Sequence, residues 1–228
     1  MLDILKDKKF YILWLISILG SVSVLPYAAA LGKIAITPNI IIAALIQSAF
    51  LFGLAIFFGL KLSKKLGFKI IPSDKFIIPS ITSGIALGLV LKFSDKFIFT
   101  TSSYLLTKQL INVEAWQGML ASIYGAVNEE ILLRLFLVSL FAFLLQKFSK
   151  IKKSKCIIAS ILFCSLIFGL GHLPALYKIL ETPHSWDILR VLTLNGLAGV
   201  VFGLLYWRYG LMASMLSHFV ADLLIHVF

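Results

Sequence analysis

Residues 121–141 read ASIYGAVNEEILLRLFLVSLF, an apolar run long enough for a membrane-spanning helix that carries three charges near its middle. Glu129 and Glu130 are adjacent in this run, and Arg134 follows one helical turn later. An ionised group near the centre of a bilayer costs at least about 2.5–3.5 kcal/mol, so such groups usually face a bundle interior or a water-filled cavity and serve a function. The stretch therefore predicts a transmembrane helix with a functional site inside it.

The composition of the chain is typical of an integral membrane protein. Of its 228 residues 60% are hydrophobic and only 14% are charged, and the mean hydropathy is +1.01, which is far more apolar than a soluble domain of this length needs. A transmembrane helix needs roughly 20 mainly apolar residues. Seven stretches are candidates, at residues 10–31, 39–60, 76–91, 115–145, 156–173, 188–207 and 211–228, and residues 97–110 add an interfacial helix or a short eighth span. We therefore predict an all-α, polytopic transmembrane bundle of seven or eight spans.

Basic residues gather in alternate loops, and this predicts the orientation of the chain. A count of seven spans places fourteen of them on one side of the membrane: Lys6, Lys8, Lys9, Lys61, Lys64, Lys65, Lys69, Lys75, Lys147, Lys150, Lys152, Lys153, Lys155 and Arg208. The other side receives Lys33, Lys92, Lys96, Lys108, Lys178 and Arg190. Because cytoplasmic loops carry the excess of basic residues, we expect a multi-pass cell-membrane protein with a cytoplasmic amino terminus. The net charge of +11 then reflects topology and anionic lipid, and no sequence signature predicts a nucleic-acid partner.

Three pairs of residues spaced four apart lie in separate apolar spans, and residues at this spacing share one face of a helix. The pairs are Glu130 with Arg134, Phe168 with His172, and His218 with Asp222. Glu129 lies about 100° round an α-helix from Glu130 and is left free to point elsewhere. The two glycines of the FGLGH stretch let a neighbouring helix or a substrate backbone approach His172 closely. We expect the polar groups of all three spans to meet in one cavity.

A carboxylate, two imidazoles and a second carboxylate in a lipid-shielded pocket are suited to hydrolysis. A carboxylate helped by histidine can remove a proton from water, and the other groups can stabilise the oxyanion formed on the attacked carbonyl. The same side chains can hold a divalent metal such as zinc, whose bound water becomes the nucleophile. The ligands would then be Glu129, His172, His218 and Asp222. No H-E-x-x-H, G-x-S-G or G-x-G-D motif occurs, which argues against zincins and against the serine and aspartate intramembrane proteases.

The three pairs, taken together, resemble the motifs of a known family. They read Glu129-Glu130-x-x-x-Arg134, Phe168-x-x-x-His172 and His218-x-x-x-Asp222, in this order and each in its own span. They look like the motifs of the CPBP family, the CAAX proteases and bacteriocin-processing (Abi) intramembrane endopeptidases. The resemblance covers residues 115–225. The small-residue tract at 199–210, which ends in an aromatic and basic turn, is also similar to that family's layout.

The resemblance implies roles for the residues of the first two motifs. Glu129, together with His172, would activate the water molecule that attacks the peptide bond. Glu130 would orient the site through Arg134, and Phe168 would pack against the site without taking part in the chemistry. The prenyl endopeptidases of this family look like glutamate enzymes. The resemblance therefore favours a glutamate-type peptidase without a cofactor, with a metallopeptidase as the alternative.

His218 and Asp222 match the pair to which this family assigns stabilisation of the oxyanion. The family often has asparagine at the second of these positions, where this chain has Asp222. An ionised aspartate donates no hydrogen bond, so Asp222 must be protonated, orient His218 or bind a metal. The departure bears on the role of Asp222 and leaves the resemblance intact.

The chain is expected to form a single integral membrane domain over residues 1–228. Its first span has a long apolar core without a clear cleavage site, so we expect it to be retained and not removed as a signal peptide. The first three spans hold no ionisable residue well inside them, whereas every acid within a span follows residue 125. We therefore interpret residues 1–110 as scaffold spans and residues 111–228 as the spans that carry the catalytic motifs.

The expected partners are membrane lipid and a peptide or protein substrate, prenylated or otherwise associated with the membrane. We expect processing of peptides or bacteriocins, or self-immunity, and the alternative is a non-catalytic membrane binding or immunity protein. Glu129 precedes the lysine cluster after its span by about 17 residues, roughly 25 Å at 1.5 Å per residue, which puts the site in the outer half of the membrane. The eukaryotic CAAX relatives have cytosol-facing sites, so this depth and that analogy disagree.

The remaining polar residues of the spans are expected to be structural. Cys156 and Cys164 lie eight residues apart on roughly one face of a helix, which excludes a disulfide between them and predicts two small buried thiols. His184 in a loop and His226 near the carboxyl end are expected to be non-catalytic. Asn195 is a candidate for a site-facing or helix-packing amide.

Overall fold

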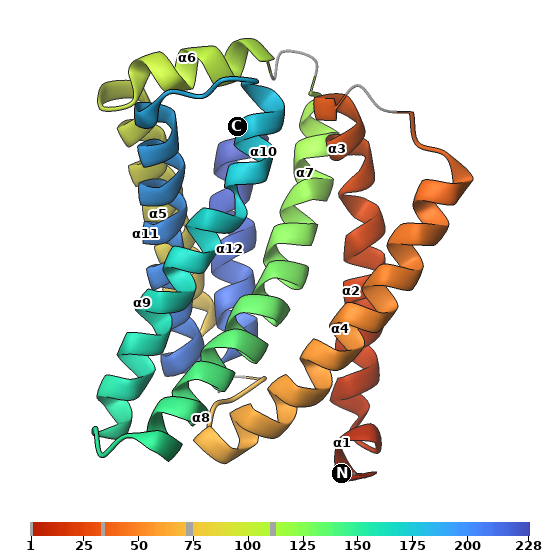
Figure 1. Ribbon diagram of the computed structural model, residues 1–228, viewed down its shortest axis with the longest axis vertical. Coiled ribbons are helices and arrows are strands. Elements are labelled where there is room, and N and C mark those ends of the chain that lie inside the picture. Colours follow the sequence, from red (N-terminus) through yellow and green to blue (C-terminus); the bar gives the residue numbers. More distant parts are fainter. Residues whose placement is uncertain (1, 33–34, 72–74, 110–112) are drawn as a thin grey trace.

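The protein is helical throughout the part that its computed structural model describes, which is residues 2–32, 35–71, 75–109 and 113–228. Within these ranges helices are present and strands are not, which confirms the predicted all-α class. Figure 1 shows the long helices side by side in one bundle, with the amino terminus at one end and the carboxyl terminus at the other. Lys33 and the predicted division between residues 110 and 111 lie outside the described ranges.

A helix occupies each of the seven predicted spans. After the short α1 (Leu2–Leu5) they are α2 and α3 (Lys8–Ser23, Leu25–Gly32), α4 (Pro38–Leu66), α5 (Ile77–Phe97), the continuous helix Ala115–Phe148, α9 and α10 (Lys153–Gly171, Leu173–Ile179), α11 (Ser185–Tyr209) and α12 (Leu211–His226). Among the described residues, six of these segments are long and apolar enough to cross a membrane, and α12 is a shorter apolar helix. The protein is a polytopic helical bundle, as predicted.

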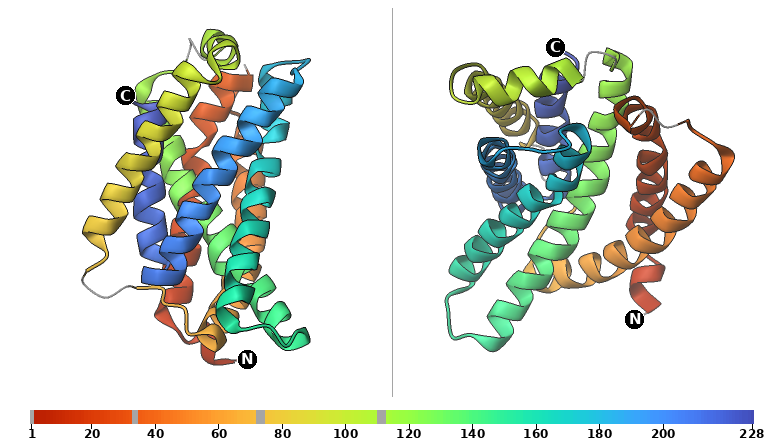
Figure 2. Two further views of the ribbon diagram at one scale, coloured as in Figure 1. Left: turned by 90° about the vertical axis from the view of Figure 1, so that its left-hand side faces the viewer. Right: turned by 45° about the horizontal axis from the view of Figure 1, so that its top comes forward.

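The segment predicted to be an interfacial helix is α6 (Thr100–Gln109). Figures 1 and 2 show α6 lying across one end of the bundle and not along the long helices. Its Ser102 hydroxyl donates a hydrogen bond to the buried carboxylate of Asp187, at the start of α11. Nearby, Arg190 of α11 binds Asp95 of α5 through two nitrogens, at 2.5 and 2.7 Å. The first contact fixes α6 to α11, and the second joins α11 to α5.

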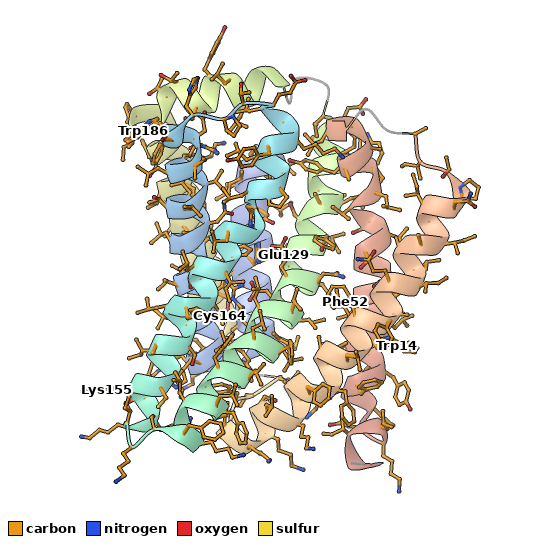
Figure 3. The ribbon with its side chains drawn as sticks, viewed as in Figure 1. Trp14, Phe52, Glu129, Lys155, Cys164 and Trp186 are labelled. Atoms are coloured by element: carbon orange, nitrogen blue, oxygen red, sulfur yellow. The ribbon has the colours of Figure 1, made fainter. Side chains whose placement is uncertain are left out.

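The loops rich in lysine meet at the end of the bundle that holds the amino terminus. We call this the basic end and define it by residues 2–9, 61–71, 75–77, 147–155 and 208–211. Lys155 marks it in Figure 3. The opposite end, called the far end, is formed by residues 25–32, 97–109, 171–185 and 222–228. The predicted gathering of basic residues at one end is therefore present, and which end faces the cytoplasm stays a prediction.

Small residues allow α5 to pack closely on α12, the helix that carries His218. A Cβ added to Gly84 would lie 2.6 Å from the carbonyl oxygen of Ser217, and one added to Gly88 would lie 2.8 Å from the side chain of Leu224. Both distances are far shorter than ordinary van der Waals contact. Helices approach this closely in membranes where small residues line the interface. The scaffold half of the chain thus positions one helix of the candidate site directly.

Candidate active site

The adjacent glutamates lie on a widened stretch of their helix. Its elements are α7 (Ala115–Tyr124), the π-helical η1 (Gly125–Glu129) and η2 (Ile131–Val138), and α8 (Ser139–Phe148). π-helical turns hold more residues than α-helical ones and are frequent at functional sites. Successive side chains are therefore less than about 100° apart around the helix axis. The directions of Glu129 and Glu130 differ less than they would on an α-helix. Glu130 pairs with Arg134, and Glu129 turns toward His218, which both glutamates approach.

Glu130 is the fully buried centre of the site. Its carboxylate lies 3.3 Å from Nε of Arg134, which is the pair that their spacing predicts. It also lies 2.9 Å from Nδ1 of His218 and accepts a hydrogen bond from the hydroxyl of Ser214. A buried carboxylate is tolerated when its oxygens are paired and hydrogen-bonded in this way. Glu130 is therefore placed to hold other side chains, and its exposed fraction of 0% leaves it no access to a substrate.

Arg134 is enclosed between aromatic rings on the inner side of Glu130. Its guanidinium lies 4.9 Å from the ring centre of Phe168 and 5.5 Å from that of Phe202, and Nη2 donates to the carbonyl oxygen of Gly199 at 3.2 Å. A guanidinium over aromatic faces gains cation–π attraction in addition to its ion pair. Phe168 therefore packs against the site through a helix separate from that of the glutamates.

His218 is the side chain that joins the buried and the accessible carboxylates. Its ring stacks on Phe202 with 4.3 Å between the ring centres, and Nδ1 must carry a hydrogen because it faces the acceptor Glu130. The other nitrogen, Nε2, lies 3.4 Å from Oδ2 of Asp222 and 3.9 Å from Oε2 of Glu129. If Nε2 carried no hydrogen, it and the two carboxylate oxygens would be three hydrogen-bond acceptors facing one another, which is unfavourable without a proton among them. The arrangement therefore requires a second proton on His218 or a proton on a carboxyl group beside it.

Glu129 and Asp222 form the accessible edge of the site. Their side chains are 24% and 17% exposed, against 4% for His218. Gly125, one turn before Glu129, leaves open the space next to them, since an added Cβ would lie 2.6 Å from Oδ2 of Asp222 and 3.2 Å from Nε2 of His218. Figure 3 shows Glu129 near the middle of the height of the bundle. We call Glu129, Glu130, Arg134, His218 and Asp222 the glutamate cluster.

His172 stands at the rim of the glutamate cluster and not inside it. It ends α9, is half-buried, and its Nδ1 donates to the carbonyl oxygen of Phe168 at 2.8 Å, so the neutral ring keeps Nε2 free as an acceptor. The ring of Phe168 contacts both histidines, with its centre 4.7 Å from that of His172 and 5.9 Å from that of His218. Among the described residues, no hydrogen bond or ion pair joins His172 to Glu129. The ring of Phe168 thus lies against both histidines, and Glu129 approaches His218 and not His172.

A family model described as type II CAAX prenyl endopeptidase, Rce1-like, matches residues 111–224. The chain belongs to this family. The matched residues contain all three motifs and begin where the catalytic spans were predicted to begin. Membership supports a CAAX-protease-like intramembrane peptidase, in agreement with the resemblance seen in the motifs. Comparisons with curated proteins and with solved structures gave no match.

The side chains of this Rce1-like chain do not form a metal site in the geometry observed. Within the described ranges, no group of three or more His, Cys, Asp or Glu residues is arranged to hold an ion. Of the four ligands expected for a metallopeptidase, Glu129 and Asp222 lie near Nε2 of His218, whereas Nδ1 of His172 bonds to the carbonyl oxygen of Phe168. His218 also directs one nitrogen to Glu130, which is itself bound by Arg134.

The other polar residues lie as follows. Cys156 and Cys164 are buried free thiols, as predicted. Asn195 donates to the carbonyl oxygen of Val191 in its own helix at 2.9 Å. The exposed His184 precedes the first turn of α11, and the ring of His226 packs on Tyr27 with 5.6 Å between ring centres.

The two glycines of FGLGH differ in their surroundings. An added Cβ on Gly169 would lie 3.1 Å from the backbone of Leu192, whereas Gly171 has open space around it. A neighbouring helix therefore approaches closely at the first glycine alone.

A second polar cluster, which the motifs did not reveal, lies on the opposite side of the π-helical stretch. Asn128 is 1% exposed and its amide donates to the carbonyl oxygen of Ser17 and to the hydroxyl of Ser21, each at 2.8 Å. Ser21 also lies 2.9 Å from the hydroxyl of Ser48 on α4. We call Asn128, Ser17, Ser21 and Ser48 the asparagine cluster. It ties the residue next to Glu129 to two helices of the scaffold half.

Proposed function

We propose that the protein is an intramembrane endopeptidase of glutamate type, in which Glu129 and His172 activate the attacking water and His218 and Asp222 stabilise the oxyanion. The observation that carries the proposal is that the two ring nitrogens of His218 have different surroundings. Its Nδ1 is held by the fully buried Glu130, while Nε2 faces the accessible Glu129 and Asp222. A histidine fixed at one nitrogen and open at the other is a suitable electrophile for a developing negative charge.

The proposed reaction has two proton transfers on Glu129. The carboxylate takes a proton from a water molecule, the resulting hydroxide adds to the carbonyl carbon, and Nε2–H of His218 binds the oxyanion that forms. The carbon–nitrogen bond then breaks as Glu129 returns its proton to the leaving nitrogen. His172 assists through its free Nε2, which can accept a hydrogen bond from the same water. Protons balance over the cycle, so a cofactor is not required.

Glu130 and Arg134 support this reaction as positioning residues. Arg134 is held by Gly199 and by the aromatic rings around it, and it fixes one oxygen of Glu130. Glu130 in turn fixes the ring of His218 from the side away from the substrate. Asp222 lies 3.4 Å from Nε2 of His218 and can accept a hydrogen bond from it, which gives aspartate a role where asparagine is common in the family.

The substrate we propose is a peptide segment that reaches the site from the membrane, prenylated or otherwise lipid-associated. A site on four helices within an apolar bundle favours a chain that is already at the membrane over a soluble folded protein. Peptide or bacteriocin processing, or self-immunity, are the biological settings proposed for such a substrate. The protein is proposed to lie in the cell membrane with a cytoplasmic amino terminus, because cytoplasmic loops carry the excess of lysine.

The test is cleavage of a panel of prenylated and unprenylated peptides by the purified protein, with and without a metal chelator. We expect turnover of at least one membrane-associated peptide, equal in both conditions and lost in Glu129→Gln. Glu114→Gln, the same change at an exposed position next to the start of this helix, should keep full turnover. Loss of turnover on chelation would contradict the metal-free mechanism. Absence of turnover with every peptide would favour a non-catalytic binding or immunity protein.

A further inference from the structure

The exposure of the glutamate cluster increases in one direction along α12. This helix begins at Leu211 in the basic end and finishes at the far end, where the carboxyl terminus lies (Figure 1). Ser214 and His218, near its start, are buried, whereas Asp222, one turn further toward the far end, is partly exposed. On this helix the candidate site is closed toward the basic end and more open toward the far end.

The same gradient occurs on two other helices, one of which runs the other way. The helix Ala115–Phe148 starts at the far end, and its first acid, Glu129, is accessible while the later Glu130 and Arg134 are buried. On α9, which runs toward the far end, Phe168 is buried and His172 is half-buried. Exposure thus rises toward the far end on three helices, although they do not all run in the same direction. The gradient is therefore a property of the whole site and not of a single helix.

Toward the basic end the site is closed by packed side chains and by a strap from the scaffold half. Tyr206 and Ser139 are fully buried and their hydroxyls lie 2.9 Å apart. Beyond them, the segment after α4 pairs with the start of α12, since the backbone N–H of Leu211 donates to the carbonyl oxygen of Lys69 at 3.0 Å. Leu211 itself is fully buried. Water and peptide are therefore excluded from this side.

The far end, in contrast, is hollowed. A cavity of about 480 Å³ lies there among α3, α6, α10 and the start of α11, and its lining includes Leu31, Leu105, Lys178 and Asp187. Its lining includes the polar or charged side chains of Lys178, Glu181, His184 and Asp187, so the cavity suits water and peptide better than lipid chains. The cavity lies at the end of the bundle toward which the exposure of the glutamate cluster rises.

We infer that the candidate site opens toward the far end, so that its substrate is a peptide segment on the side of the membrane opposite the basic loops. The inference of a substrate rests on the proposed function, whereas the direction of opening rests on burial alone. With the basic end in the cytoplasm, the peptides cleaved are extracytoplasmic ones, such as the outer flank of a membrane-inserted or exported peptide. Cytosolic carboxyl-terminal tails would not reach the site.

Cysteine accessibility tests the direction of opening without requiring any turnover. The two native thiols are buried, at 1% and 3% exposure, so the unmodified protein supplies a low background. Asp222→Cys and Glu129→Cys report on the site from two different helices. Lys155→Cys marks the basic end, and Tyr104→Cys, at a position 67% exposed on α6, marks the far end. A membrane-impermeant maleimide is applied to intact cells and to inside-out vesicles.

We expect both site variants to react in the same preparation as Tyr104→Cys and to stay unreacted in the preparation that labels Lys155→Cys. Reaction from the side of Lys155→Cys, or no reaction from either side in variants that accumulate normally, would overturn the inference. If one site variant fails to accumulate, the other reports the same quantity. A protein that labels as expected but cleaves no peptide would refute the proposed function alone, and a peptidase that labels from the basic side would refute this inference alone.

Discussion

Two polar clusters lie on opposite sides of the same π-helical stretch, and they are built differently. The asparagine cluster is neutral and buried, and its side chains bond to one another and to backbone carbonyls. The glutamate cluster consists of ionisable side chains, and its exposure rises from Glu130 to Glu129. Neighbouring positions, 128 and 129, thus belong to environments of opposite kind.

The difference indicates that the asparagine cluster serves helix packing and that the glutamate cluster is available for chemistry. Hydrogen bonds between neutral side chains stabilise helix packing in membranes by modest amounts, about 0.6 kcal/mol for an average interhelical bond. The glutamate cluster leaves Nε2 of His218 beside two carboxylates and leaves those carboxylates accessible. The two clusters should therefore respond differently to substitution.

The largest effect is expected from Arg134→Leu, which removes the partner of the fully buried Glu130. Breaking a buried ion pair costs about 3–5 kcal/mol because one charge is left uncompensated. Thermal unfolding of the purified protein in detergent measures the loss. Adding Glu130→Gln should restore most of the stability, and Arg208→Leu, at an exposed position of the basic end, should leave it unchanged. Equal effects of Arg134→Leu and Arg208→Leu would contradict the ion-pair network.

The next effect concerns the oxyanion. His218→Asn removes Nε2 and should lower turnover by about 10²- to 10³-fold, as the loss of one oxyanion donor does in other hydrolases. The matched change on the same helix, His226→Asn, should lower turnover little, because His226 packs on Tyr27 and contacts no member of the glutamate cluster. Rates are measured with the peptide cleaved best by the unmodified protein. Similar losses in both variants would refute the special position of His218.

A smaller effect is expected from filling the space beside the accessible carboxylates. Gly125→Ala would place a methyl group against Asp222 and His218, and an overpacked position costs about 1–3 kcal/mol. Because the side chain of Asp222 is partly exposed, it can move aside, so the loss of stability should be small. The displaced Asp222 should nevertheless lower turnover clearly. Gly196→Ala, where the space is open, should change neither quantity. Both are read from turnover and thermal unfolding, and full activity in Gly125→Ala would contradict the observed geometry.

The smallest effect is expected in the asparagine cluster. Asn128→Ala removes two hydrogen bonds to the scaffold and should lower stability by about 1 kcal/mol, the size of one or two interhelical hydrogen bonds. Ser48→Ala, at the edge of the cluster, should cost less. Turnover per folded molecule should change far less than in any variant of the glutamate cluster. Abolished turnover in a stable Asn128→Ala protein would contradict the placement of the chemistry in the glutamate cluster.

The spans and the pairs at four-residue spacing could be predicted because they depend on local periodicity. The apolar runs fixed the seven helices, and the Glu130–Arg134 and His218–Asp222 pairs lie as their spacing indicates. The π-helical widening could not be predicted, since no residue type demands it and packing against other helices decides it. The contacts of Asn128 with Ser17 escaped notice for a similar reason, because they join residues 111 positions apart. Ser214 was within reach, since it lies four residues before His218 on the same face.

The reaction proposed depends on Glu129 more than on any other side chain, and turnover by Glu129→Gln tests it most directly. Glutamine keeps the size and hydrogen-bonding ability of the side chain but cannot take a proton from water. Because Glu129 is partly exposed, thermal stability should equal that of the unmodified protein, while turnover should fall by about 10²- to 10⁴-fold, the usual contribution of a general base. A stable Glu129→Gln protein that cleaves its peptide at the unmodified rate would contradict the account.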